Sequence, residues 1–343
     1  MEIKKAIHLS FWLVVMMSTS CSREHLFYES VSRDKVKLNI DWSETAFEPG
    51  SRDYDDDNHL NGVTIFAFDA KTHQLVEERP PNPNWQSPEL TLSPGTYDLI
   101  LINDSRAELH GIVFDMSQSF INFNVSTRGD TVFTDQPDYL AVSAVKGVFF
   151  QPAQTEYHHD MPDGYYRDYI SQEFTAIQKA VTKRINVTVL VKGMNYCKGM
   201  MPSYITGLAK SVNLATRKTT EEETVYAINL VNREFRKDTY TEATLTQSFR
   251  CFGFNEKKFQ KGTKFELTIN FVLVDNSIHT VKTDITEQFK DWYEKHSIDV
   301  DLNLDINVNM EVELPEVQEE PKEGEGLDAE TIPWNDIIQN IVL

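Results

Sequence analysis

Two runs of ligand-type side chains in the sequence could hold a metal ion. Residues 53–58 read Asp-Tyr-Asp-Asp-Asp-Asn, with aspartates at alternate positions as in calcium loops. An EF-hand needs Gly at its sixth position and Glu at its twelfth, where this chain has Asn58 and Thr64. The second run, residues 158–163, holds two histidines and two aspartates. We expect both to be solvated polar segments, with metal binding as the alternative.

No recognisable catalytic frame accompanies these side chains. The sequence lacks Gly-x-Ser-x-Gly, His-Glu-x-x-His and the glycine-rich loops that cradle phosphates. Its many carboxylates are scattered, so they carry no information about glycosidase chemistry. Cys197 and Cys251 could pair in an oxidising compartment or could each be a small buried side chain. We therefore expect no enzyme activity, no metal and no cofactor.

The clearest chemistry belongs to Cys21. A basic head, Lys4-Lys5, precedes a short apolar run from Ala6 to Met17, and Ser18-Thr19-Ser20 leads into the cysteine. This order is typical of a secretory signal, and the apolar run is too short for a bilayer-spanning helix, which needs about 20 residues. The segment resembles a bacterial lipoprotein signal, although Ser18 stands where Leu is usual. An ordinary secreted protein cut nearby is the alternative.

Lipidation of Cys21 has a physical consequence. Residues 1–20 would be removed, and acyl chains such as palmitate on Cys21 would fix the mature chain to a membrane, since more than one chain anchors a protein stably. The polar residues that follow predict a tether over 21–34. The formal net charge of −20 argues against nucleic acid as a partner.

Short strands dominate the first part of the mature chain. Apolar residues alternate with polar ones from Val36 to Trp42, which predicts a strand with one buried face. Residues 63–69 are apolar on both faces and predict a central strand, with a return strand at 74–77. Prolines between 80 and 88 indicate irregular structure. Residues 89–92 and 96–102 predict a hairpin around Ser93-Pro94-Gly95. This pattern predicts a β-sandwich over 35–155.

The pattern begins again after the composition break at residues 151–168. Strands are predicted at 185–191, 204–208, 212–214, 225–230, 243–254, 265–274 and 279–283, and together they predict a second β-sandwich over 156–314. Residues 284–295 are the best helical candidate, because apolar side chains recur there at three- and four-residue steps. Glu221-Glu222-Glu223 indicates a hairpin tip. We expect an all-β chain with few short helices.

The C-terminal part combines a long alternating run with an apolar end. Every second residue from Ile298 to Leu314 is apolar, which is longer than a usual strand of about 3–10 residues. An acidic stretch follows, and residues 332–343 are largely apolar. We therefore expect 315–343 to be a solvated acidic linker that ends in an apolar segment able to dock on another surface. The candidate pairing or docking residues are Val300, Leu302, Leu304, Ile306, Val308, Trp334, Ile337, Ile338 and Ile341.

The residues between 61 and 104 carry a family resemblance. Val63–Phe68, followed by Leu92-x-Pro94-Gly95-x-Tyr97-x-Leu99-x-Leu101-x-Asn103, resembles the fimbrillins and fimbrial-anchor lipoproteins of Bacteroidetes-type (type V) pili. The resemblance implies two tandem transthyretin-like antiparallel β-sandwich domains of Greek-key type and assembly by strand exchange with other pilus subunits. It also implies a lipid-anchored protein of the outer membrane, cell surface or fimbrium. Shaft subunits are cut after an arginine, for which Arg33 and Arg52 are candidates.

Two functions are compatible with these patterns. The first is assembly, anchoring or adhesion of a fimbria by β-strand exchange, with a host surface or glycan as a further ligand. The alternative is a non-catalytic surface lipoprotein that binds glycans through aromatic side chains, for which the candidates are Trp85, Tyr157, Tyr165 and Tyr166.

Overall fold

The computed structural model describes residues 28–32, 34–45, 62–82, 84, 86–117, 119–129, 135–152, 154–158, 169–230, 232–236, 240–255, 257–296 and 305–318. Strands make up most of this part, and its two α-helices are short: α2 (Lys257–Lys261) and α3 (Thr286–His296). The prediction of an all-β chain is confirmed. Among the described residues no helix has the length and apolar character needed to span a membrane.

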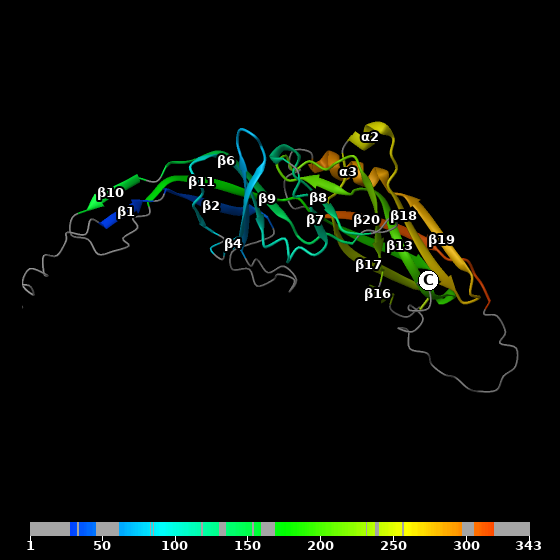
Figure 1. Ribbon diagram of the computed structural model, residues 1–343. Coiled ribbons are helices and arrows are strands. Elements are labelled where there is room, and N and C mark those ends of the chain that lie inside the picture. The colour runs from blue at the N-terminus through cyan, green and yellow to red at the C-terminus, as the bar shows by residue number, and fades with distance from the viewer. Residues whose placement is uncertain are drawn as a thin grey trace, which may run out of the picture.

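The first half is built on a seven-stranded sheet with the order β4-β3-β6-β9-β11-β2-β5. Its strands are β2 (Asp34–Glu44), β3 (Val63–Asp69), β4 (Leu75–Asn82), β5 (Glu89–Leu90), β6 (Gly95–Asn103), β9 (Ala141–Phe150) and β11 (Tyr169–Ala180). A separate two-stranded ribbon of β1 (Tyr28–Ser32) and β10 (Gln154–His158) extends from this sheet away from the rest of the molecule (Figure 1).

Strand β3 is buried on both faces, as the sequence predicts. Its residues from Val63 to Phe68 are all buried, because two cores lie on opposite sides of it. Side chains such as Ile65 pack with those of β2 and β11 across the curved sheet. Phe66 and Phe68 face the other way and meet Phe123 edge to face, at ring-centroid distances of 5.1 and 5.3 Å. The buried aromatic rings hold β3 between the two cores, although in the sheet it lies next to the edge strand β4 and not at the centre.

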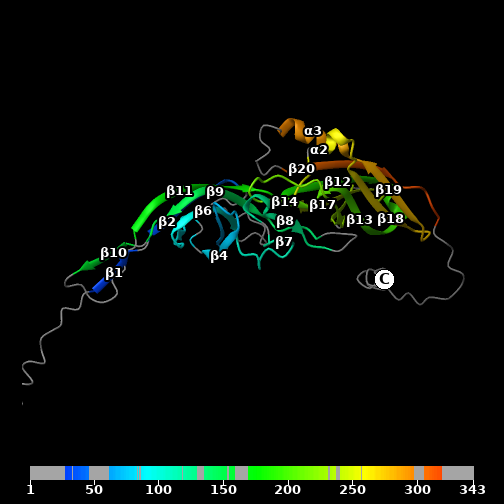
Figure 2. The ribbon, with the colours of Figure 1, turned by 45° about the horizontal axis from the view of Figure 1, so that its top comes forward.

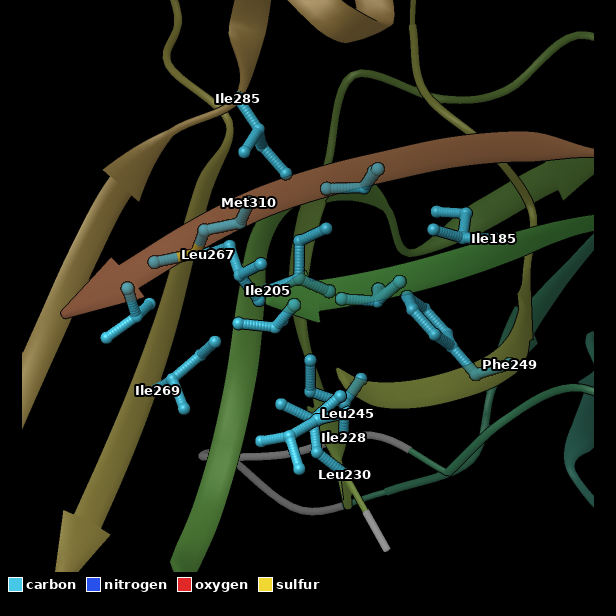
Figure 3. Close-up of a cluster of buried hydrophobic side chains, with 14 of the residues drawn as sticks. Ile185, Ile205, Ile228, Leu230, Leu245, Phe249, Leu267, Ile269, Ile285 and Met310 are labelled. Carbon is cyan, nitrogen blue, oxygen red and sulfur yellow. The ribbon is translucent and has the colours of Figure 1, made fainter. Parts of the chain in front are cut away.

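The second half is a β-sandwich of two four-stranded sheets. One has the order β16-β17-β12-β20 and the other β15-β13-β18-β19. Figure 3 shows their inward-facing side chains, such as Leu245 and Ile269, gathered between the two sheets. The strands are β12 (Lys183–Lys192), β13 (Cys197–Ala209), β15 (Glu223–Ile228), β16 (Asn232–Phe235), β17 (Glu242–Cys251), β18 (Glu266–Leu273), β19 (Ile278–Asp284) and β20 (Ile306–Glu313).

A third, small sheet joins the two halves. Strand β14 (Ser211–Asn213) pairs with β8 (Asn124–Thr127), which pairs with β7 (Ile112–Phe114). The join is extended by backbone hydrogen bonds on both sides, since Thr127 donates to the Lys210 carbonyl and Leu214 donates to the Phe123 carbonyl. Val212, Leu214 and Phe252 complete the aromatic core of the first half. This aromatic core therefore contains side chains from both halves of the chain.

Several local predictions are confirmed. The alternating run from Val36 to Trp42 forms β2, with those apolar side chains buried. Residues 63–69 and the return strand pair as β3 and β4. The helical candidate forms α3, which buries Phe289.

Other local predictions are wrong. Strands β5 and β6 do not form a hairpin: β5 pairs with β2, while β6 lies between β3 and β9. Pro80 and Pro81 lie within β4, where a strand tolerates proline because β4 is at the edge of its sheet. The sheets are mainly antiparallel, but β2 pairs in parallel with β11 and β12 with β20.

The segments around the expected domain boundary also form strands. Residues 28–32, within the expected tether, pair as β1 with β10. Strand β11 follows the composition break, yet it pairs with β2 and β9 of the first sheet. The chain thus leaves the first sheet at Ala180 and enters the second half at Lys183.

Candidate functional site

The predicted site residues fall into two groups. Ile306 and Val308 lie in β20, and both are fully buried. Residues Cys21, Val300, Leu302, Leu304, Trp334, Ile337, Ile338 and Ile341 lie outside the described residues. Their roles remain predictions, so the site is built here from β20 outward.

Strand β20 is the edge strand of its sheet. It runs parallel to β12 in an unbroken register from Ile185 opposite Ile306 to Lys192 opposite Glu313. Alternate side chains point into the sandwich, and those between them are exposed, as the alternating sequence requires. Because the order of the sheet ends at β20, the backbone groups on its outer side are not used by another strand among the described residues.

Helix α3 covers part of this outer edge. The side-chain amide of Gln288 donates to the Asn309 carbonyl at 2.9 Å and accepts from the Asn309 N–H at 2.9 Å. The indole Nε1 of Trp292 donates to the Asp305 carbonyl at 3.1 Å. These contacts satisfy groups that a pairing strand would otherwise use. They occupy the first part of β20 and leave its end near Glu313 without such a contact to α3.

A capping carboxylate fixes the start of α3. Asp284 accepts a hydrogen bond from the Thr286 N–H at 3.0 Å, as an acidic residue at a helix start often does. Hydrogen bonds from the Thr286 side chain and backbone lower the pKa of Asp284. The carboxylate therefore stays charged in moderately acidic solution, where it favours the helix N-terminus.

The two ends of the described chain lie far apart. Strand β1 and the outer end of β20 are at opposite ends of the elongated molecule in both views (Figures 1 and 2). Leu314 is buried and Val317 packs against the sandwich core, so the chain is held to the second half up to that point. Whatever precedes β1 and whatever follows Gln318 begin at opposite ends.

The other candidate side chains of the sequence do not assemble into a site. The acidic run 53–58 and the aromatic side chains of Trp85, Tyr157, Tyr165 and Tyr166 lie outside what the structure describes, as do the side chains of 158–163. Within the described part, no group of three or more His, Cys, Asp or Glu side chains could hold a metal ion.

The glutamate run at the start of β15 is paired with lysines. Glu221 meets Lys257 and Lys261, Glu222 meets Lys210 at 2.7 Å, and Glu223 meets Lys258 at 2.8 Å. The three carboxylates hold α2 and the end of β13 together. Both described cysteines are free thiols: Cys251 is buried and Cys197 is half-buried.

Sequence periodicity predicts that the side chains of β20 alternate between buried and exposed. It does not predict that α3 covers the outer edge of this strand. Gln288 and Trp292 are the site residues that periodicity misses, because a side-chain amide that bonds a distant backbone leaves no periodic signal. The one feature of the sequence that could have pointed to Gln288 is its position next to Phe289, which is buried, on the side of the helix.

Comparison with solved structures shows which known folds the chain is similar to. A candidate adhesin from Bacteroides thetaiotaomicron matches with a TM-score of 0.52 and 12% identity, over 84% of this chain and 92% of its own. The chain has the fold of that protein. No protein-family model matches the sequence, and neither does a curated protein.

Two further solved structures cover similar shares of the chain. A candidate adhesin from Bacteroides ovatus matches with a TM-score of 0.49 and 15% identity, over 83% of this chain and 94% of its own. The fimbrial anchor protein Mfa2 from Porphyromonas gingivalis matches with a TM-score of 0.45 and 13% identity, over 82% and 90%.

Proposed function

We propose that this protein is a surface-exposed outer-membrane lipoprotein of the fimbrillin-like class, which joins other subunits of a fimbria by β-strand exchange and catalyses no reaction. The placement of the first and last described strands supports the proposal, since β1 and the end of β20 lie at opposite ends of the described molecule (Figure 2). A lipid on Cys21 would hold one end at the membrane. The other end would be presented for contact.

The edge of β20 supports strand exchange as the mode of contact. In β-strand addition, main-chain hydrogen bonds provide affinity and alternate side-chain pockets set the register. The segment that would pair with a neighbouring subunit is the acidic and apolar stretch that follows Gln318 in the sequence. The fold shared with a candidate adhesin supports a role at the cell surface.

A truncation that ends at Gln318 tests the proposal. The cut must fall there, because Leu314 and Val317 belong to the core of the second half. We expect the truncated chain to keep its folded far-UV circular dichroism spectrum and its Tm, yet to be missing from isolated surface filaments by immunoblot. Truncated protein that enters filaments at the normal level would contradict strand exchange through this segment.

A Cys21→Ala variant is the matched control for anchoring. We expect it to lose acylation and to leave the membrane fraction while its fold stays intact, because Cys21 precedes every described strand of the fold. If it remained in the membrane fraction, the lipid would not be the anchor.

A further inference from the structure

A cleft of about 690 Å³ opens where the chain passes from the first half to the second, at Ala180–Lys183. Three segments form its walls: residues 216–221, which lead into β15; residues 252–255, which follow β17, together with Lys257 of α2; and Trp292 and Tyr293 of α3. Both ribbon views place α2 and α3 near each other (Figures 1 and 2), and the rings of Phe259 and Tyr293 meet between them at 5.8 Å. A cleft of this volume at a junction of two packed units is a common position for a ligand.

The charges that line the cleft are mainly positive, although the chain as a whole carries −20. Four cationic side chains line it, and Glu221 is the one carboxylate among its lining residues. Lys261 and Lys257 bond to Glu221, and these hydrogen bonds lower its pKa. Within the described residues Lys218 has no carboxylate partner and is exposed. The cations that line the cleft are Lys183, Arg217, Lys218 and Lys257.

One wall of the cleft is aromatic. Phe254 stands edge to face with Trp292 and Tyr293, at ring-centroid distances of 6.0 and 6.3 Å. All three line the cleft and are half-buried, so each still offers ring surface. Phe254 is also packed edge to face on Phe289, at 5.3 Å. The rings are therefore held in place from behind and do not need to order when a ligand arrives.

Hydrogen bonds join the cationic segment 216–221 to the segment 252–255, which carries Phe254 of the aromatic wall. The Thr219 hydroxyl donates to the Phe254 carbonyl at 3.1 Å, and the Asn255 side-chain amide donates to the Thr219 carbonyl at 2.8 Å. Gly253 has a φ of +83°, a left-handed value that glycine adopts without strain. The cationic wall and the aromatic wall therefore keep a fixed separation.

From this arrangement we infer that the cleft binds an anionic saccharide unit, with its acidic group at the lysines and arginine and its ring against the aromatic wall. A sugar ring presents a face of C–H groups that packs on an aromatic ring, and its hydroxyls suit the threonine and asparagine side chains nearby. A carboxylate or sulfate accepts charge-assisted hydrogen bonds from Lys and Arg. The cleft adjoins the start of β20, since Ile306 lines it and Trp292 also donates to the Asp305 carbonyl. The inference does not depend on fimbrial assembly.

Calorimetric titration of the full mature chain, prepared without its lipid, tests the inference. The probes are an oligogalacturonate, which carries carboxylates, a heparin-derived oligosaccharide, which carries sulfates, and a neutral malto-oligosaccharide of equal length. We expect at least one anionic probe to bind, the neutral probe not to bind, and the affinity to fall as salt is raised. The pair of anionic probes distinguishes carboxylate from sulfate.

Substitutions then place the binding in the cleft. Lys218→Ala should weaken binding about tenfold, the loss expected for one charge-assisted contact. The matched control is Lys282→Ala on β19, an ion-paired lysine outside the cleft, which should bind as the unchanged protein does. Tyr293→Ala should also weaken binding, whereas Tyr240→Ala, which removes an exposed ring elsewhere, should not.

Four outcomes would overturn the inference. They are equal binding of the neutral probe, no binding of either anionic saccharide, unchanged affinity in Lys218→Ala, and binding only of an acidic peptide with the sequence of residues 315–330. The last result would assign the cleft to the C-terminal segment of a second copy. A protein that binds the saccharide but stays out of filaments would count against the proposed function alone.

Discussion

Lys258 is a buried cation with two partners that lie in different strands. Its side chain is 4% exposed, and its Nζ donates to the Gly207 carbonyl at 3.1 Å and meets Glu223 Oε1 at 2.8 Å. The carbonyl belongs to β13 and the carboxylate to β15. A lysine in this position is stabilising only while both partners are present, because a buried charge or carbonyl without a partner is costly.

Replacing Lys258 by Ala should lower the free energy of unfolding by about 1–3 kcal/mol, because the Gly207 carbonyl loses its donor inside the protein. Urea unfolding measures the change. The matched control is Lys261→Ala in the same helix, where the ion pair with Glu221 is exposed and is worth less than about 1 kcal/mol. Equal losses in the two variants would show that burial of Lys258 does not matter.

The buried thiol of Cys251 should be inert in the folded protein. Burial raises its pKa from 9.0 to about 12, and the thiolate is the reactive form. In the native protein at pH 8 we expect Ellman's reagent to modify Cys251 only after denaturant is added. The half-buried Cys197, whose pKa burial also raises, should react slowly. The thiol that reacts only after denaturant is added should be missing in Cys251→Ala, whereas the slow native-state reaction of Cys197 should remain.

The same shift makes stability depend on pH. The unfolded thiol loses its proton near 9.0, while the folded one keeps it until about 12, so the free energy of unfolding falls as pH rises through this interval. The stability difference between the unchanged protein and Cys251→Ala should therefore shrink between pH 9 and pH 11. A constant difference would contradict the assigned cause.

At the scale of elements, α3 acts as a partial cover for the edge of β20. Gln288 occupies the N–H and the carbonyl of Asn309 together, so a strand cannot pair there until the glutamine moves. Gln288→Ala should cost about 0.5–1.5 kcal/mol of stability for the lost hydrogen bonds. It should also raise self-association at high concentration, because an exposed strand edge is a template for pairing.

Sedimentation velocity over a range of concentrations measures the self-association. The matched control is Glu287→Ala, at the preceding residue of α3, whose side chain is 80% exposed and, among the described residues, pairs with Lys290 of the same helix. If Glu287→Ala associated as strongly as Gln288→Ala, the effect would come from lost helix stability or charge and not from the edge.

Individual elements were predictable because each depends on local alternation. Val36, Leu38, Ile40 and Trp42 alternate with polar residues, and this alone places them on the buried face of β2. Pairing was not predictable, since nothing in β5 encodes that its partner is β2 and not β6. Such choices depend on contacts between residues far apart in the chain. The cover of β20 by Gln288 is hidden for the same reason, whereas the alternation of Ile306 and Val308 is evident.

At the scale of the whole molecule, the shared core argues that both halves unfold together. Val212 and Leu214 belong to the second half in sequence, yet they pack with Phe66 and Phe123 of the first. Strands β14 and β8 continue this contact through backbone hydrogen bonds. Neither half can open here without exposing the apolar core of the other, so a single cooperative transition is expected.

Two single-tryptophan variants can report on the halves separately. Trp42 is buried in β2 of the first half, and Trp292 lies in α3 of the second. Their fluorescence should change at the same urea concentration. Leu214→Ala should lower that midpoint for both reporters, since truncation of a fully buried leucine costs about 2–5 kcal/mol. A shift seen by Trp292 alone would mean that the halves fold independently, in which case a pull on one half would not be transmitted through a shared core to the other.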